Sequence, residues 1–445
     1  MSNQKSLNTS KYMYSRSLLV SVILVLMGFT LACQNADSNN MVDTDTTTGE
    51  ISGDTLLTVV QEKTFQYFWD GAEPNSGLAR ERIHVDGVYP QDDKHIVTTG
   101  GSGFGLMGLI VGIERGFITR SEGVERFERI VDFLESADRF HGAWPHWLNG
   151  ETGEIAPFSQ KDDGGDLVET AFLAQGLITA RQHFRDGTER EQQLAEKIDE
   201  LWRGIEWDWY RQGGENVLYW HWSPNHGWDM DFPLQGYNET LITYIMAAAS
   251  PTHSIPAKVY HDGWARGGDI TSDEVTQGHP LVLDHYNSDT DKGYGGPLFW
   301  AHYSYLGLDP RGLTDKYGDY WQLNKSHTLL NRQWCLDNPN GFEGYGEDLW
   351  GLTASYTANE DGSVGYKAHR PHDDNGVITP TAALSSMPYT PNHSMDVIEN
   401  LYHNFGNKTF GPYGFYDAMS VEKNFFPKRY LAIDQGPIVV MIENY

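Results

Sequence analysis

One dense group of acidic side chains has a spacing suited to acid–base chemistry. It comprises Asp162, Asp163, Asp166 and Glu169, and it precedes an apolar stretch that continues to Phe184. In a helix that begins near Asp166, this residue and Glu169 share a face, while Asp162 lies in the loop above. Carboxylates gathered in a cleft raise one another's pKa, whereas a helix N-terminus favours the ionised form. The group can therefore hold a protonated and an ionised carboxyl together, although capping alone would explain a single Asp.

A second acidic candidate is Glu239, which directly precedes the apolar run 241–249. A charge at the mouth of a buried helix is expected to be paired, capping or functional. Glycosidic cleavage with inversion needs two carboxyl groups about 6.5–9.5 Å apart, one as acid and one as base for water. Carboxylates on neighbouring buried helices could span that gap, so the two positions together predict glycoside hydrolysis.

Aromatic residues are concentrated near these acids, in Trp144-Pro145-His146-Trp147 and in residues 219–222. Sugar faces stack on such rings, although any one Trp can equally belong to the core. The predicted substrate-binding residues are Trp144, His146, Trp222, Glu347, Trp350 and Asp434. The histidines lack the spacing of a zinc site, and neither a phosphate-binding glycine loop nor a G-x-S-x-G motif occurs. We therefore expect neither a metal nor a cofactor.

Two kinds of apolar segment alternate along the chain and predict helices. The first kind has one charged face and is expected on the outside. Its members are residues 54–69, 121–139, 189–210, 256–265, 317–337 and 394–405. The second kind is short, apolar on most faces and therefore expected to be buried. Its members are residues 103–116, 166–184, 239–250, 297–306, 348–356 and 435–445, with 379–387 as a possible extra element.

Six outer and six inner helices in alternation outline an all-α fold, an (α/α)6 barrel. The turns before the inner helices would meet at one end of such a barrel. Five of these turns are rich in glycine and acidic residues: 98–103, 162–166, 236–239, 344–348 and 432–436. Such turns cap helices, but five of them in equivalent places also predict the lining of a pocket.

The first 32 residues are typical of a secretory signal. Three cations precede an apolar run of about a dozen residues, too short to span a membrane, and the run ends in Leu31-Ala32-Cys33. Cys33 at the cleavage site predicts lipid attachment, although an ordinary secreted protein remains the alternative. Residues 33–50 are polar and predict a flexible tether, and residues 51–445 a single catalytic domain. We expect an exported protein that is anchored by lipid in the bacterial cell envelope.

The charge balance restricts the partners. The formal net charge is −29, and removal of the leader, which carries three cations and no acid, makes it −32. Such a surface repels nucleic acid, anionic lipid and polyuronates, but it accepts a neutral oligo- or polysaccharide. The only cysteine besides Cys33 is Cys335, so no disulfide is expected, and the 14 Trp, 24 Tyr and 19 Phe must supply a large core. We expect a monomer with no contact to the membrane except the anchor.

Residues 55–445 resemble the glycoamylase-like domain of glycoside hydrolase family 144, whose known members act on β-1,2-glucans. The resemblance rests on five motifs taken together: Trp144-Pro145-His146-Trp147, the run 161–170, Gly236-Tyr237-Asn238-Glu239, the run 350–355 and the ending Asp434-Gln435-Gly436-Pro437. It implies an inverting hydrolase of a neutral β-glucan that needs no metal. The implied activity is that of an endo-β-1,2-glucanase or of an enzyme that releases sophorose.

The family's acidic pattern falls on Asp162, Asp166 and Glu169, and its later glutamate falls on Glu239. We expect Glu239 to be the acid, Asp166 or Asp162 the base, and Glu169 to hold the sugar or tune its neighbours. Two other functions remain as alternatives. A non-catalytic glycan-binding lipoprotein would not need four convergent carboxylates. A polysaccharide lyase with an α-barrel would need a cationic pocket, which suits this acidic chain poorly.

Overall fold

The computed structural model describes residue 51, residues 53–285 and residues 293–445, which belong to one mostly helical, compact unit. The predicted leader, residues 1–32, and the tether with Cys33 lie outside the described residues. Cys335 is buried and carries a free thiol. Within the described ranges, no helix has the length and apolar character needed to cross a bilayer.

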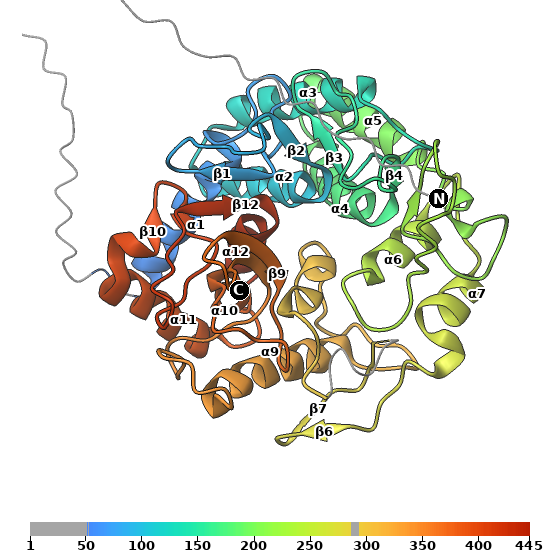
Figure 1. Cartoon of the computed structure of the whole chain (residues 1–445). Helices are drawn as coiled ribbons and strands as arrows, with labels where there is room; N and C mark the ends of the chain where they lie inside the picture. The colour runs from blue at the N-terminus through green and yellow to red at the C-terminus, as the bar shows by residue number, and fades with distance from the viewer. Residues whose placement is uncertain (1–50, 52, 286–292) are drawn as a thin grey trace, which may run out of the picture. The chain divides into compact units, whose positions relative to one another are not determined.

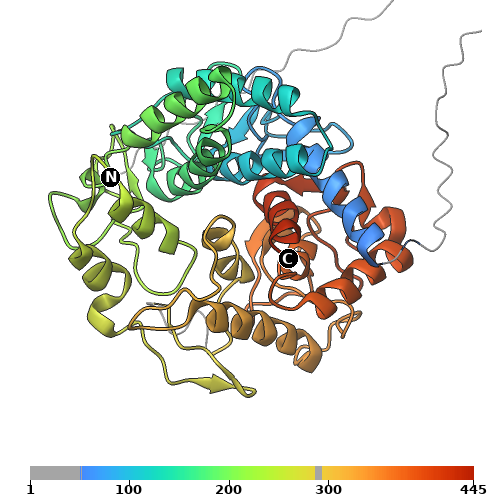
Figure 2. The same cartoon turned by 180° about the vertical axis from the view of Figure 1, so that it is seen from behind.

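Buried helices alternate along the chain with helices that keep an exposed face. The exposed kind comprises α1 (Gly53–Trp69), α3 (Arg120–Ser136), α5 (Glu189–Arg203), α7 (Ala257–Val259) continued by the π-turn η2 (Tyr260–Trp264), α9 (Tyr320–Asp337) and α11 (Pro391–Asn400) continued by η6 (Leu401–Phe405). The buried kind comprises α2 (Thr99–Glu114), α4 (Leu167–Phe184), α6 (Leu241–Ala249), the 3-10 turns η4 (Leu298–Ala301) and η5 (Tyr303–Tyr305), α10 (Pro380–Leu384) and α12 (Ala432–Asn444). Figures 1 and 2 show that these elements follow one another around a ring, which α12 closes by packing on α1 and α2.

The predicted inner helix 348–356 is wrong. Gly351 has φ of +129°, outside the helical region, and a Cβ there would lie 2.8 Å from the Cβ of Ala382. Residues 354–358 then form a strand. The buried position is taken instead by α10, which lies within the segment 379–387 that the sequence marks as a possible extra element. The predicted helix 297–306 consists only of 3-10 turns, and the helix predicted for 189–210 ends at Arg203.

Strands occur only as short antiparallel pairs in the described residues, and most of them brace the turns between helices. The pairs are β1 (Arg82–His84) with β12 (Arg429–Leu431), β2 (Ile96–Thr98) with β3 (Trp147–Asn149), β4 (Gly165–Asp166) with β5 (His221–Trp222), β6 (Val275–Thr276) with β7 (His279–Pro280), β8 (Ala354–Ala358) with β9 (Val364–Ala368) and β10 (Phe410–Gly411) with β11 (Gly414–Phe415). The hairpin β8–β9 is the longest of these pairs, with Tyr356 directly opposite Tyr366.

Side-chain caps determine where several helices begin. Thr119 and Thr188 form capping boxes with glutamates three residues later, at the starts of α3 and α5. Asp166 caps α4, and Asp319 caps α9. These caps satisfy backbone N–H groups that otherwise have no partner in a helix.

The two helices α2 and α4 approach each other through glycines. A Cβ on Gly103 would lie 2.1 Å from the backbone oxygen of Phe172, and one on Gly176 would lie 2.2 Å from that of Gly103. Only glycine therefore fits at this crossing. The close approach brings the start of α2 against the first turn of α4, where Glu169 lies.

Candidate active site

A cavity of about 380 Å³ lies where the turns before the buried helices meet. Its wall includes Thr98 before α2, Glu169 in the first turn of α4, Glu239 before α6, Phe299 in η4 and Ile433 at the start of α12. The predicted convergence of turns is thus observed for these helices. The turn 344–348 contributes no lining residue because the segment after it is not an inner helix.

Asp166 is fully buried, and hydrogen bonds occupy both of its carboxylate oxygens. Its Oδ1 accepts the N–H groups of Val168 and Glu169 at 3.0 and 2.9 Å, which caps α4. Its Oδ2 accepts His146 Nδ1 at 2.9 Å and the indole N–H of Trp220 at 3.0 Å. Asp166 is not part of the cavity wall. Asp166 therefore acts as a buried carboxylate that orients two residues of the cavity wall, His146 and Trp220.

His146 lies in the cavity wall between this carboxylate and an aromatic cover. Its ring lies 4.2 Å from that of Phe158, measured between centroids. Burial by itself lowers the pKa of His146, but the negative charges of Glu169, Asp166 and Asp162 outweigh it and raise the pKa to about 10. His146 is therefore an imidazolium at neutral pH, and it supplies a positive charge beside the carboxyl groups of the site.

Asp162 lies behind His146 and outside the cavity wall. Its Oδ1 is 3.2 Å from His221 Nε2, and its Oδ2 is 4.0 Å from His146 Nδ1. Burial, followed by the charge of Asp166, raises the pKa of Asp162 to about 7. Burial lowers the pKa of His221, whose Nε2 accepts the N–H of Gly164. The imidazole of His221 is therefore neutral, and Asp162 is partly protonated near pH 7.

Glu169 faces the cavity and also caps the neighbouring helix. Its Oε2 accepts the backbone N–H of Gly100, in the first turn of α2, at 2.8 Å. Thr98 occupies the N-cap position of α2, but its side chain makes no cap hydrogen bond. Burial raises the pKa of Glu169 to about 7, and the His146 charge and the Gly100 N–H oppose that rise.

Glu239 reaches the same cavity from the turn before α6. Burial raises its pKa to about 7, with the charge of Asp166 adding to the rise and its own backbone N–H opposing it. The backbone is held by Ser304, whose hydroxyl donates to the Glu239 carbonyl and accepts the N–H of Ile242. Asn238 fixes the turn by accepting both the N–H and the hydroxyl of Thr240. Two carboxyl groups that titrate near neutral pH therefore line one cavity.

Acidic residues and a tyrosine line or support the side of the cavity formed by α12 and the β8–β9 hairpin, and the sequence patterns indicated only one of them, Asp434. Asp434 is buried beside Asp417, and burial and then the Asp417 charge raise the pKa of Asp434 well above its usual range. Burial also raises the pKa of Asp417, to about 6. Glu81 and Tyr366 line the cavity itself, whereas the predicted Asp434 does not. Glu81, Asp417 and Tyr366, which the sequence patterns did not indicate, come from turns and a hairpin, so no helical spacing connects them.

Five predicted substrate-binding residues, Asp434 among them, do not line the cavity. Trp144 and Trp350 are 0% exposed, so neither ring can stack on a sugar. Trp222 is half-buried against His141, and Glu347 is exposed on a turn elsewhere. The rings of Trp144 and Trp350 instead pack in the hydrophobic core, where large aromatic side chains contribute much of the buried area. His146 is the one predicted substrate-binding residue in the wall.

His146, Asp162 and Asp166 place possible metal-ligand atoms within 4.8 Å of one another. The hydrogen bonds described above already occupy both oxygens of Asp166 and the Nδ1 of His146. Because His146 is an imidazolium that donates from Nδ1 to Asp166, this nitrogen has no lone pair to offer a cation. Charge compensation among the three groups therefore accounts for their arrangement.

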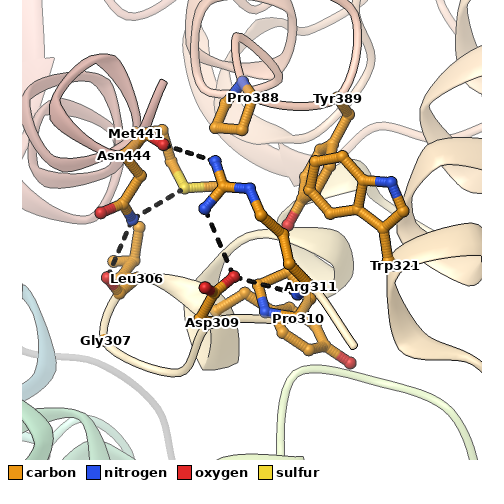
Figure 3. Close-up of a pocket in the computed structure, with 11 residues that line it drawn as sticks. Leu306, Gly307, Asp309, Pro310, Arg311, Trp321, Pro388, Tyr389, Met441 and Asn444 are labelled. Carbon is orange, nitrogen blue, oxygen red and sulfur yellow. Dashed lines mark hydrogen bonds and ion pairs between the residues drawn. The ribbon is translucent and has the colours of Figure 1, made fainter. Parts of the chain in front are cut away.

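A second, smaller pocket of about 140 Å³ lies at the other end of the buried elements (Figure 3). It is lined by residues that follow η5 and α10 and by the last turn of α12. Arg311 fills its middle, donating to the Asn444 carbonyl at 2.7 Å and to Asp309 at 3.3 Å, with Trp321 beside it. Hydrogen bonds within the protein thus satisfy the polar groups at the centre of this pocket.

The site and the fold define a class. Two carboxyl groups with pKa values near 7, in a cavity lined by aromatic rings, are typical of the active site of a glycoside hydrolase. Comparison with known proteins agrees. Residues 231–445 match the sequence profile of the family described as "Putative glucoamylase".

Solved and characterised relatives cover nearly the whole chain. An endo-β-1,2-glucanase from Chitinophaga pinensis, solved with sophorotriose and glucose, is 61% identical over 89% of this chain and 93% of its own, with a TM-score of 0.86. An exo β-1,2-glucooligosaccharide sophorohydrolase from Parabacteroides distasonis is 45% identical over 92% of this chain, which spans 57% of that relative. A Talaromyces funiculosus endo-β-1,2-glucanase, 12% identical over 88% of this chain and 84% of its own with a TM-score of 0.64, shares the fold.

The chain belongs to glycoside hydrolase family 144, the glycoamylase-like family.

Proposed function

We propose that this chain hydrolyses β-1,2-glucan as an endo-acting, inverting glycosidase. The observation that carries the proposal is the pair Glu169 and Glu239, which line one cavity with pKa values near 7 in a chain 61% identical to an endo-β-1,2-glucanase. We favour endo action because the exo-acting relative is less similar and is matched over only 57% of its length.

Glu239 is the better proton donor of the pair. Its pKa is lowered only by its own backbone N–H, whereas His146 and the Gly100 N–H both stabilise the ionised form of Glu169. In this scheme Glu239 protonates the leaving glycosidic oxygen, and Glu169 removes a proton from the water that attacks the anomeric carbon from the opposite face. The sequence suggested Asp166 as a possible base. Because hydrogen bonds occupy both of its oxygens, we propose instead that Asp166 orients His146 and Trp220.

The proposal also extends to the architecture and the location. We propose that the ring is an (α/α)6 barrel, because six exposed and six buried helical positions alternate along the described chain.

The basic, apolar leader and Cys33 support export and lipid anchoring in the cell envelope. Protein with Cys33→Ser should appear in the soluble fraction, whereas membrane retention of this variant would contradict the anchor.

Product analysis tests the activity directly. Purified protein is incubated with linear β-1,2-glucan, sophorose, laminarin and maltodextrin, and the products are resolved by chromatography over time. The proposal predicts β-1,2-oligosaccharides of several lengths from the first substrate, with little release from laminarin or maltodextrin. Sophorose as the sole early product would indicate exo action, and cleavage of maltodextrin alone would contradict the proposal.

A further inference from the structure

The hairpin β8–β9 carries two opposed tyrosines whose surroundings differ. Tyr356 is 4% exposed, its hydroxyl is 3.0 Å from His84 Nε2, and the guanidinium of Arg429 covers its ring. Tyr366, its direct partner across the hairpin, is 56% exposed. Among residues 53–285 and 293–445, Tyr366 has neither an aromatic neighbour for its ring nor a hydrogen bond from its hydroxyl.

Tyr366 is exposed at the wall of the cavity. Its ring lines the same cavity as Glu169 and Glu239. Desolvation of the hydroxyl, and then the charges of Asp434 and Glu81, raise the pKa of Tyr366 well above its usual range. The hydroxyl therefore keeps its proton at neutral pH and remains a hydrogen-bond donor.

A flat apolar face and a polar tip suit one class of ligand. A sugar ring offers C–H groups on its faces and hydroxyl groups at its edge, which match an aromatic ring and a phenolic donor. The carboxyl groups around the cavity disfavour an anionic ligand. An ordinary surface tyrosine would lie on open surface, whereas this one has a concave site around it.

We propose that Tyr366 is a sugar-binding platform, which stacks on one glucosyl unit of a neutral glucan while Glu169 and Glu239 act on the neighbouring bond. This inference rests on the proposed function for the identity of the glucan. It makes Tyr366 a specificity residue contributed by the hairpin, separate from the acid–base residues on the helices. Because the side chain has no protein partner, its removal should affect binding much more than folding.

Calorimetric titration of linear β-1,2-glucan oligosaccharides into a Glu239→Gln parent, whose turnover should be slowed by about 10² to 10⁴, tests the platform. Added Tyr366→Ala should weaken binding about tenfold, added Tyr366→Leu nearly as much, and added Tyr366→Phe only a few-fold, because the Phe ring can still stack. Val364→Ala, two residues earlier on the same exposed strand, is the matched control and should change Kd less than twofold. The melting temperatures of all four should agree within a few degrees.

The outcomes separate this inference from the proposed function. Unchanged affinity in Tyr366→Ala, or a Leu variant that binds as well as the Phe variant, would overturn the platform while leaving hydrolysis intact. A wild type that binds but does not cleave β-1,2-glucan would overturn the proposed function and leave the platform standing. A parent that binds no β-1,2-glucan would contradict both.

Discussion

The two pockets at opposite ends of the buried helices differ in how their polar groups are paired. In the small pocket of Figure 3, Arg311 is neutralised by Asp309 and donates to the Asn444 carbonyl, so its charge has a structural role. In the larger cavity, Glu169 and Glu239 share a wall with Tyr366, and burial has moved the pKa values of both carboxyls to about 7.

The difference shows which kind of polar residue marks a site in this fold. Both ends of a helix need polar groups, because both leave backbone N–H or C=O groups without partners. Structural residues meet that need and are then fully paired. A buried carboxyl group whose pKa lies near 7, or a polar side chain without a protein partner, lowers the stability of the fold. Such groups in a cavity are therefore candidates for functional residues.

The largest effect should follow from removal of the proposed acid. Glu239→Gln preserves shape and removes the proton, and general acid–base catalysis typically contributes about 10² to 10⁴ in rate, so kcat should fall by that range. Glu347→Gln is the matched control, because Glu347 is exposed and does not line the cavity. Its kcat should stay within twofold of wild type in assays on linear β-1,2-glucan. Near-normal turnover of Glu239→Gln would remove Glu239 from the chemistry.

A smaller loss is expected when Asp166 is replaced by Asn. The new amide can still cap α4, but it presents N–H groups to His146 or Trp220 and removes a negative charge. We expect kcat/KM to fall about ten- to a hundredfold, less than for Glu239→Gln, with stability lowered by up to about 1 kcal/mol. Asp319→Asn, at the cap of α9, should change stability alone. A loss from Asp166→Asn as large as that from Glu239→Gln would return the base role to Asp166.

The dependence of stability on pH should reveal the buried carboxyl of Glu239. Its pKa in the folded protein, about 7, exceeds the ordinary value of 4.5, so the folded state binds this proton more tightly. Stability from this group is therefore greatest at low pH and is lost as pH rises from about 4.5 to 7. The Glu239→Gln variant does not have this pH-dependent loss. The melting temperature of the variant minus that of wild type should therefore be about 1–3 °C larger at pH 8 than at pH 5. A constant difference would show that the Glu239 pKa is not raised.

The smallest effect on activity is expected in the pocket of Figure 3. Arg311→Ala removes the bonds to Asp309 and Asn444, and because the side chain is about half exposed the loss should be only about 0.5–1 kcal/mol. The value of kcat/KM should remain within twofold of wild type. A tenfold decrease at unchanged stability would show that this end of the molecule also takes part in substrate handling.

Much of the helical fold follows from the sequence, because alternation of amphipathic and fully apolar segments reflects where each helix lies. The exceptions have local causes. Gly351 interrupts an apolar run that otherwise has the composition of a buried helix, and α10 is too short, at five residues, to give a clear period. Thr119 and Thr188, by contrast, mark the starts of α3 and α5 through side chains that bond to the next turn.

The site was less accessible to prediction from the sequence. Glu169 and Glu239 are indicated because they stand at the starts of apolar helices, a local feature. The sequence cannot separate Trp144, a core residue, from His146, two positions away and in the cavity wall. Tyr366 is hidden for another reason, since its exposure depends on a hairpin that folds over a distant part of the chain.

The stereochemistry of the first product tests the two-carboxylate account most directly. Hydrolysis of linear β-1,2-glucan is followed by proton NMR in the first minutes, before the new reducing ends equilibrate between anomers. An inverting reaction at a β-linkage, with Glu239 as acid and Glu169 as base, predicts that the α-anomer accumulates first. An initial excess of the β-anomer would mean retention of configuration, and it would contradict the inverting scheme and the role of Glu169 as the base that activates water.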